Sequence, residues 1–264
     1  MLSKRAALFF FLVWLSMLSS AQQSPDELPA NPGRPTVSTP ATLTPVGYLQ
    51  FENGYLYAND SPEFSSQSSL NEVMKLTLTS RIQFLVSANP FAHSQINGEP
   101  TNGAGGVSLG VQGVLLPGEG KRPTISMSYF RSIYDGDTPD LDIGSAKNSL
   151  MLLGSGDVKG FHYDTNFMFN QQESGSTNRA QFGQTLSISH PLKGKFGLSG
   201  EIWHFTQPFL RSNAVGNLWA VNYNARKNLV IDMGFNCGLT DTSTRWEVFV
   251  GFTYLLPHRV LPHW

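Results

Sequence analysis

The feature that most constrains the fold is an alternation of apolar and polar side chains with a period of two residues. It is clearest between Gly160 and Gln171, where one face carries Phe161, Tyr163, Thr165, Phe167 and Phe169, and the other carries His162, Asp164, Asn166, Met168 and Asn170. Successive side chains of a strand point to opposite sides, so this pattern predicts a strand with one apolar and one polar face. The same alternation recurs at 229–238 and 245–255.

About twelve segments between Val46 and Leu255 fit this template, and most are 9 to 12 residues long. A tilted strand needs about 9 to 11 residues to cross the hydrocarbon of a bilayer. The predicted strands are 46–57, 68–78, 82–90, 105–116, 124–134, 147–154, 159–171, 180–190, 196–207, 216–225, 229–238 and 245–255. We therefore predict an all-β fold, a transmembrane antiparallel up-and-down β-barrel of about 12 strands.

The links between these segments alternate in length. Short links rich in Gly, Pro, Ser, Lys and Arg fall at 79–81, 117–123, 155–158, 191–195 and 226–228, and mostly longer polar links fall at 58–67, 91–104, 135–146, 172–179, 208–215 and 239–244. Outer-membrane barrels have short periplasmic turns and longer extracellular loops. An even strand number then places both termini on the periplasmic side.

A secreted β-sandwich is the soluble alternative, because its strands alternate in the same way. The strands predicted here are long for a sandwich. Aromatic residues also lie near the predicted rims, as interfacial girdles require: Tyr48, Tyr55, Tyr57, Tyr134, Trp203, Trp219, Trp246 and Tyr254.

Composition agrees with a barrel. Charged residues make up 14% of the chain, against roughly 25% in ordinary soluble domains. After the N-terminal segment no apolar run approaches the 18 residues of a transmembrane helix. The net charge of −1 gives no reason to expect a nucleic-acid partner. The single cysteine, Cys237, excludes an intramolecular disulfide.

The two ends of the chain differ from the barrel segment. Residues 1–21 have a basic start, a short apolar run from Ala6 to Leu15 and small residues before Gln22, which is the layout of a cleaved signal peptide. Residues 22–45 contain six prolines, so we predict an extended, mobile periplasmic arm rather than a packed element. The barrel is expected over 46–255, followed by a tail at 256–264 with two prolines before Trp264.

Several local motifs resemble the outer-membrane barrel family named for the meta-pathway of phenol degradation, often called simply a transporter family. They are Glu52 followed by Gly54 and Tyr55, a hairpin at 70–85 with an arginine at its tip, Glu201 in Gly-Glu-Ile-Trp, and the closing pair 228–239 followed by a strand ending Gly-Phe-Thr-Tyr. The resemblance covers most of 45–255 and implies the barrel fold, the outer membrane and, weakly, a transport role. Cys237 and the tail depart from the family pattern.

The polar faces of the predicted strands point into the barrel lumen. The lumen-lining candidates are Glu52, Lys75, His162, Asp164, Asn166, Glu201, Asp232 and Glu247. Charges in this position avoid lipid and pair with one another. Such a lining serves either as a selectivity surface for a small solute or as a network that fills and stiffens the barrel.

Three functions follow from these observations. The first is an outer-membrane channel or transporter for small, aromatic or hydrophobic, solutes. The second is a non-conducting structural or adhesive barrel that acts through its extracellular loops. The third, an interfacial lipid hydrolase built on His204 and Ser212, lacks a recognisable motif, so we expect no enzyme. No cofactor or metal site is expected, and the expected partners are outer-membrane lipids, the barrel assembly machinery and the solute.

One residue conflicts with this scheme. Arg131 shares a face with Ile125, Met127, Tyr129 and Ile133, and would therefore face lipid. A charge at mid-depth on that face costs about 2–4 kcal/mol, and less near the interface. Arg131 must then lie near a rim, or a bulge must shift the register at Tyr129 and Phe130.

Overall fold

The computed structural model describes residues 27–136, 146–174 and 176–262, and within them the chain is all-β. No helix among these residues is long and apolar enough to cross a membrane. The strands are β1 (Leu49–Asn59), β2 (Ser66–Thr79), β3 (Ile82–Ile96), β4 (Glu99–Gly103), β5 (Val107–Leu116), β6 (Thr124–Tyr134), β7 (Ala146–Val158), β8 (Phe161–Ser174), β9 (Thr177–Pro191), β10 (Phe196–Gln207), β11 (Ser212–Arg226), β12 (Leu229–Gly238) and β13 (Trp246–Leu255). The expected signal peptide, 1–21, lies outside the described residues.

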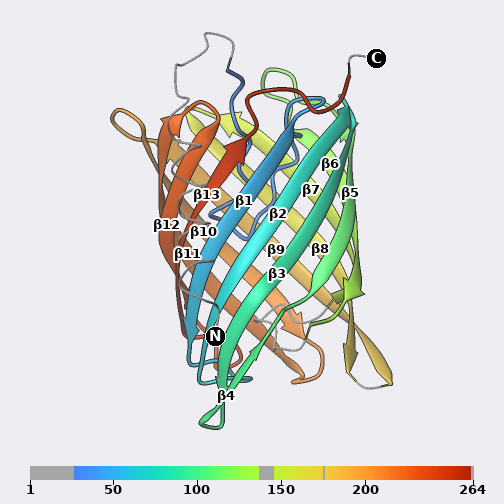
Figure 1. Cartoon of the computed structure of the whole chain (residues 1–264), viewed down its shortest axis with the longest axis vertical. Coiled ribbons are helices and arrows are strands. Elements are labelled where there is room, and N and C mark those ends of the chain that lie inside the picture. The colour runs from blue at the N-terminus through green and yellow to red at the C-terminus, as the bar shows by residue number, and fades with distance from the viewer. Residues whose placement is uncertain (1–26, 137–145, 175, 263–264) are drawn as a thin grey trace, which may run out of the picture.

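The strands form one closed antiparallel barrel (Figure 1). Apart from β4 and β5, consecutive strands pair with one another, and β1 closes the ring by pairing with β13 from Gln50↔Leu255 to Asn59↔Trp246. Strands β4 and β5 occupy one position together, because both pair with β3, at Ala92–Ile96 and Ile82–Ala88 respectively. The barrel therefore has 12 strand positions, as the alternation predicted.

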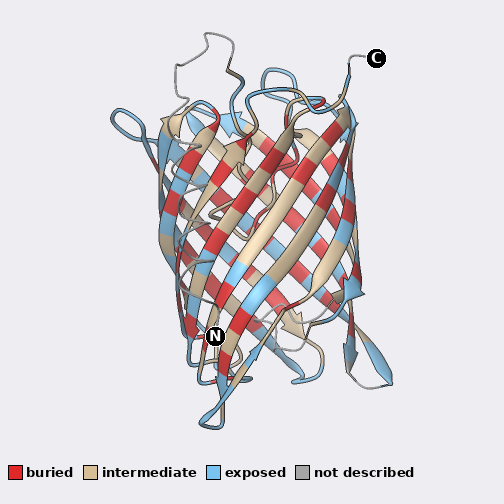
Figure 2. Cartoon of the chain, viewed as in Figure 1, coloured by how far each residue is buried: buried red, intermediate tan, exposed pale blue. Residues whose placement is uncertain are grey.

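Buried and exposed residues alternate along most of the strands (Figure 2), and most of the buried residues in the described ranges are polar. Gln112 and Asn166 are 1% and 0% exposed, whereas Phe167 and Met233 are 56% and 59% exposed. An apolar outer surface is what a hydrocarbon solvent requires, and a closed ring leaves no unpaired sheet edge. The β-sandwich alternative is wrong, because a sandwich would bury its apolar face.

The connections divide into two rims. The short-turn rim, at the top of Figure 1, contains the turns at 80–81, 117–123, 159–160, 192–195 and 227–228; the long-loop rim contains the other connections. The predicted loop at 91–104 is wrong in part, because β3 and β4 continue as a hairpin around Asn97 and Gly98. Both residues have positive φ, 53° and 84°, which is the backbone of the tight turn that Asn-Gly favours. Likewise, the predicted link at 155–158 belongs to β7, and the chain turns at 159–160.

Two side chains test the predicted register. Arg131 faces outward three residues before the end of β6, and its Nη1 donates to Asn148 Oδ1 at 3.3 Å. The register is continuous at Tyr129 and Phe130, so the arginine lies near the long-loop rim and no bulge hides it. Trp203 is 3% exposed on the inner face, so it does not contribute to an interfacial girdle.

The Pro-rich arm differs from the expectation of a mobile, unpacked segment. Residues 31–44, which we call the lumen segment, lie inside the barrel and hydrogen-bond to its inner wall (Figure 1). Proline prevents ladder and helix formation, but the residues between the prolines keep N–H donors, and inward side chains accept from them. The arm is thus packed without secondary structure.

The tail after β13 also folds against the barrel. Leu256 N donates to Leu49 O at 2.9 Å, and Val260 N donates to Gly47 O at 2.8 Å. The backbone therefore brings the tail back to the start of β1, at the short-turn rim.

Candidate functional site: the barrel lumen

The lumen segment is bound mainly through its own backbone. The N–H groups of Asn31, Gly33, Thr39, Ala41 and Thr44 donate to side-chain oxygens of Gln50, Glu52, Asn166, Ser155 and Gln83, at 2.6–3.0 Å. These acceptors belong to β1, β8, β7 and β3, and further bonds reach β2, β5, β6, β9, β10 and β12. The segment therefore loops across the lumen and touches the wall nearly all the way round.

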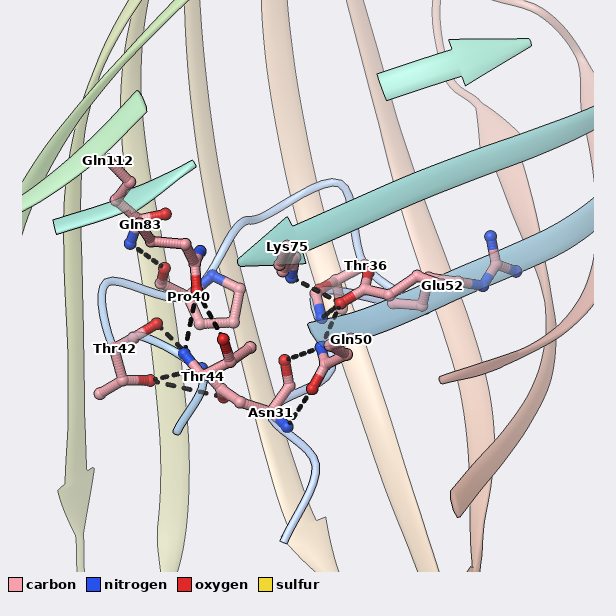
Figure 3. A network of polar contacts seen from close by, with 12 residues as sticks. Asn31, Thr36, Pro40, Thr42, Thr44, Gln50, Glu52, Lys75, Gln83 and Gln112 are labelled. Carbon is pink, nitrogen blue, oxygen red and sulfur yellow. Dashed lines mark hydrogen bonds and ion pairs between the residues drawn. The ribbon is translucent and has the colours of Figure 1, made fainter. Parts of the chain in front are cut away.

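Two amide side chains bind the segment as a neighbouring strand would. Asn166 accepts from Thr39 N at 2.6 Å and donates to Thr39 O at 2.9 Å. Gln50 does the same with Asn31, at 2.9 and 2.8 Å (Figure 3). A carboxamide carries one acceptor and two donors, so it satisfies both polar groups of a peptide residue that has no strand partner.

Glu201 anchors the part of the segment at Val37 and Ser38. Its carboxylate is buried on β10 and accepts from Val37 N, Ser38 N and Ser38 Oγ at 2.6–2.7 Å. Ser38 Oγ also lies 2.8 Å from Thr185 Oγ1 on β9. Hydrogen bonds to an ionised acceptor are stronger than neutral ones, so this carboxylate holds the turn of the segment against the wall.

Arg34 forms the ion pair that joins the segment to β12. Its Nη2 lies 3.0 Å from Asp232 Oδ1, and Asp232 is 2% exposed. The guanidinium also lies 5.9 Å from the Phe249 ring centroid. A Cβ at Gly54 or Gly251 would overlap this guanidinium, and the register pairs these two glycines directly. The glycine pair therefore leaves room for the arginine.

A second ion pair lies beside it. Lys75 Nζ is 2.5 Å from Glu52 Oε1, and both side chains are almost fully buried (Figure 3). Glu52 also accepts from Gln50 Nε2 and from Gly33 N. The pair is thus satisfied by the wall and by the segment together, which offsets the cost of removing two charges from water.

The remaining predicted residues take different places. Asp164 accepts from Ser155, the residue that binds Ala41 N, and His162 lies between Asp164 and Asp157 at 3.4 and 3.0 Å. Glu247 is buried on β13 opposite Ala58 and Asn236, close to the long-loop rim. All eight predicted residues except the half-buried His162 are buried on inner faces, and Glu52, Asn166, Glu201 and Asp232 contact the lumen segment directly.

The sequence did not predict the lumen segment or, apart from Asn166, the neutral side chains that accept hydrogen bonds from it. One signal was present. The eight candidates include five carboxylates and a single lysine, which leaves excess negative charge inside the barrel. Arg34 is the only charged residue between Glu27 and Glu52. It is therefore the one cation that the Pro-rich arm can supply to balance the negative charge inside the barrel.

An apolar patch on the inner wall packs against the lumen segment. Met151, Leu153, Met168, Trp203 and Phe205 are buried there, and Ala41 and Val37 of the segment pack against them. Trp203 and Phe205 lie near the end of β10 that leads to the long-loop rim, with ring centroids 5.9 Å apart. Trp203 Nε1 donates to Asn236 Oδ1 at 2.8 Å. The lumen is thus polar on the short-turn side and partly apolar toward the long loops.

The outer face gives little support to a hydrolase. His204 faces outward, and its Nε2 lies 3.0 Å from Asn213 Oδ1. Ser212 pairs in register with Gln207, three residues along β10 from His204. Residues three apart on a strand point to opposite faces, so the Ser212 side chain lies on the face opposite to His204 and the two cannot form a nucleophile–base hydrogen bond.

Comparison with known proteins agrees with this architecture. No protein-family model matches the sequence, and no curated protein matches it. Among solved structures, an outer membrane channel from Pseudomonas putida F1 is similar with a TM-score of 0.60 at 12% identity, covering 86% of this chain and 99% of that one. The NanC porin (TM-score 0.54, 8% identity) and the KdgM porin (0.52, 10%) each match over 78% of this chain and 98% of their own. At these identities the likeness shows the fold: this chain is built as outer-membrane channels and porins are.

Proposed function

We propose that this protein is an outer-membrane channel for small solutes, and that the lumen segment is its plug. The observation that carries the proposal is the ring of hydrogen bonds between residues 31–44 and the inner wall. A segment placed across the lumen governs whether solute passes, since any path through the barrel runs beside it. Membership of the phenol-degradation family remains a prediction.

The chemistry of the contacts fits a segment that can leave. The barrel closes through its own ladder from β1 to β13, which does not use the segment. The segment is bound instead by side-chain hydrogen bonds, each contributing about 0.5–1.5 kcal/mol, or about 1.5–3 kcal/mol at the carboxylates, and by the Arg34–Asp232 pair. Undocking therefore opens these contacts and leaves the sheet intact.

The apolar patch supports the solute class. A solute that enters from the long-loop rim passes inward polar groups such as Asn170 and Gln181, and then meets Trp203, Phe205 and Met168 before it reaches the lumen segment. Aromatic rings and a thioether offer stacking and dispersion contacts to a flat apolar molecule. We therefore propose that the transported solutes are small aromatic or hydrophobic compounds.

A reversible cross-link tests the plug. Ser38 Oγ and Thr185 Oγ1 are 2.8 Å apart, so cysteines at these two positions can be joined to fix the segment to β9. In a Cys237→Ser background, ion conductance of Ser38→Cys/Thr185→Cys in planar bilayers is expected to be low when oxidised and to rise on reduction. The Thr185→Cys single variant is the control and should not respond to redox conditions.

Liposome influx tests the solute. Reduced protein should admit a small aromatic acid such as benzoate faster than glucose. Replacing Phe205 by Asn should reduce that preference, while the outward Phe167→Asn variant should leave it unchanged. Equal conductance with and without the cross-link would overturn the plug, and no flux of any small solute from reduced or segment-deleted protein would overturn the channel.

The second candidate is a non-conducting barrel that acts through its loops. The specific observation in its favour is that the segment occupies the lumen, while β3 and β4 extend as a hairpin at the long-loop rim (Figure 1). Absence of flux in every redox state of the cross-linked protein is the result this candidate expects.

A further inference from the structure

The short-turn rim carries a ring of positive charge. Each of its five turns, with the strand ends beside it, and also the tail, contributes at least one cation: Arg81, Lys121, Arg122, Lys159, Lys193, Lys195, Arg226, Lys227 and Arg259. In the same turns and strand ends the carboxylates are Glu119 and Asp157. Half of the 18 lysines and arginines of the chain are thus gathered at one end of the barrel.

The opposite rim has no such excess. In its described connections and within two residues of the strand ends, the acids Asp60, Glu63, Glu99, Asp135, Glu173, Asp241 and Glu247 accompany the cations Lys147, Arg179, Arg211 and Arg245. Opposite charges are mixed there, so the local field is small. The positive ring is therefore a property of one rim and not of barrel ends in general.

Most of the ring is available to a partner. Arg81, Lys121, Lys159, Lys193 and Lys227 are exposed, and within the described parts of the chain none of them forms an ion pair. Arg122 pairs with Glu119 at 3.2 Å, and Lys195 Nζ donates to Ala225 O at 2.8 Å. Five side chains around the circumference thus keep their donors for an external acceptor.

Aromatic side chains fix the depth of this ring in a membrane. Phe161 and Phe196 face outward and are 47% and 48% exposed. Phe161 follows Lys159 by two residues and Phe196 follows Lys195 by one, so each aromatic ring lies on the membrane side of its lysine. Phe161 stacks on His190 at 4.5 Å between centroids, and Phe196 lies 5.0 Å from Tyr223. Outward aromatic groups of this kind lie at the boundary between hydrocarbon and headgroups. The cations directly beyond them are then at headgroup level.

We propose that the short-turn rim is a binding surface for anionic phospholipids, with the phosphodiester of a phosphatidylglycerol-type headgroup held between neighbouring lysines. The ammonium groups donate to the phosphate oxygens while the acyl chains lie along the apolar outer wall below them. The ring selects the lipids that surround one end of the barrel, and this selection is independent of whether the lumen conducts.

Native mass spectrometry of the detergent-solubilised mature protein tests the surface. Phosphatidylglycerol is titrated against phosphatidylcholine of the same acyl chains. The test variant is Lys159→Gln/Lys193→Gln/Lys227→Gln, and the matched control is Lys147→Gln/Arg211→Gln/Arg245→Gln at the other rim. Each cation near an anionic surface contributes roughly a fivefold gain in affinity, so the test variant should bind phosphatidylglycerol at least tenfold more weakly.

The outcomes separate the possible sources of phosphate. Wild-type protein should prefer phosphatidylglycerol to phosphatidylcholine, and the control variant should keep that preference. Equal binding of both lipids, or an equal loss in the two variants, overturns the proposal. Displacement by inorganic phosphate or glycerol phosphate at matched concentration, or a stronger preference for lipid A, overturns the phospholipid as the partner. Heat-modifiable gel migration verifies that every variant is folded, and conductance gives a separate reading of the channel.

Discussion

At the scale of single residues, the lumen shows how an acidic interior is balanced by a cation from outside the sheet. Asp232 is 2% exposed and its charge is compensated by Arg34, a residue of the Pro-rich arm. The five inward carboxylates were visible as an alternation on the strands, because strand geometry fixes which side chains share a face. Their partner was not visible, since no periodicity relates an irregular segment to a strand. Only the charge imbalance indicated that a cation was missing.

Replacing Arg34 by Ala is expected to release the lumen segment, because Asp232 would remain buried without its counter-charge. Breaking a buried pair costs roughly 3–5 kcal/mol, and we expect the lower end here since Arg34 is 18% exposed. Amide hydrogen exchange of Gly33, Val37 and Ala41 should accelerate by roughly 100-fold. Arg179→Ala, which removes a cation that contacts Phe209 and Pro208 at the long-loop rim, is the control and should leave these amides protected.

Glu201 gives a milder version of the same test. Glu201→Gln keeps one acceptor oxygen but replaces the carboxylate that receives three donors from Val37 and Ser38. A hydrogen bond to a charged group contributes about 1.5–3 kcal/mol, so exchange at Val37 and Ser38 should accelerate by roughly 10- to 100-fold. Exchange at Thr44, bound by Gln83 on β3, should change less. A uniform acceleration along the segment would mean that it docks as one cooperative unit.

At the scale of elements, the strands followed from the sequence more closely than the connections did. Alternation located all 12 barrel positions, because a lipid-facing wall and a polar lumen act on every residue of a strand. The β3–β4 hairpin was not predicted because its outer part, at 91–104, lies beyond the wall that separates lipid from the polar lumen. Apolar and polar residues therefore alternate only weakly there. The lumen segment was not predicted for a related reason. Its prolines exclude a helix or a ladder strand, but they do not indicate which surface the segment packs against.

Arg131 and Met127 form a matched pair on the outer face of β6. Both point outward, but Arg131 pairs with Asn148, two residues from the long-loop end of β7, while Met127 pairs with Leu152 in the middle of β7. Arg131→Ala should change the unfolding free energy in phospholipid vesicles by less than about 1 kcal/mol, whereas Met127→Arg should lower it by about 2–4 kcal/mol. Equal costs at the two positions would contradict the depth assigned to β6.

At the scale of the whole molecule, the two rims differ in chemistry as well as in loop length. The lumen segment enters at the short-turn rim, where Ala30 N donates to Lys227 O at 2.9 Å, and the tail returns to the same rim through Gly47. The positive ring is there too, while the apolar patch opens toward the long loops. These features are consistent with one orientation, in which solute arrives over the long loops and the plug is held from the side where the chain begins.

Cysteine labelling on intact cells tests that orientation directly. In a Cys237→Ser background, Asn97→Cys places a thiol at the tip of the β3–β4 hairpin, and Lys193→Cys places one in the exposed β9–β10 turn. Long loops of outer-membrane barrels face the exterior, so a membrane-impermeant maleimide should label Asn97→Cys on intact cells. Lys193→Cys should react only after the outer membrane is permeabilised. The reverse pattern would place the basic ring in the outer leaflet, and the lipid proposed to bind it would then have to change with it, because the phosphate groups of that leaflet belong to lipid A.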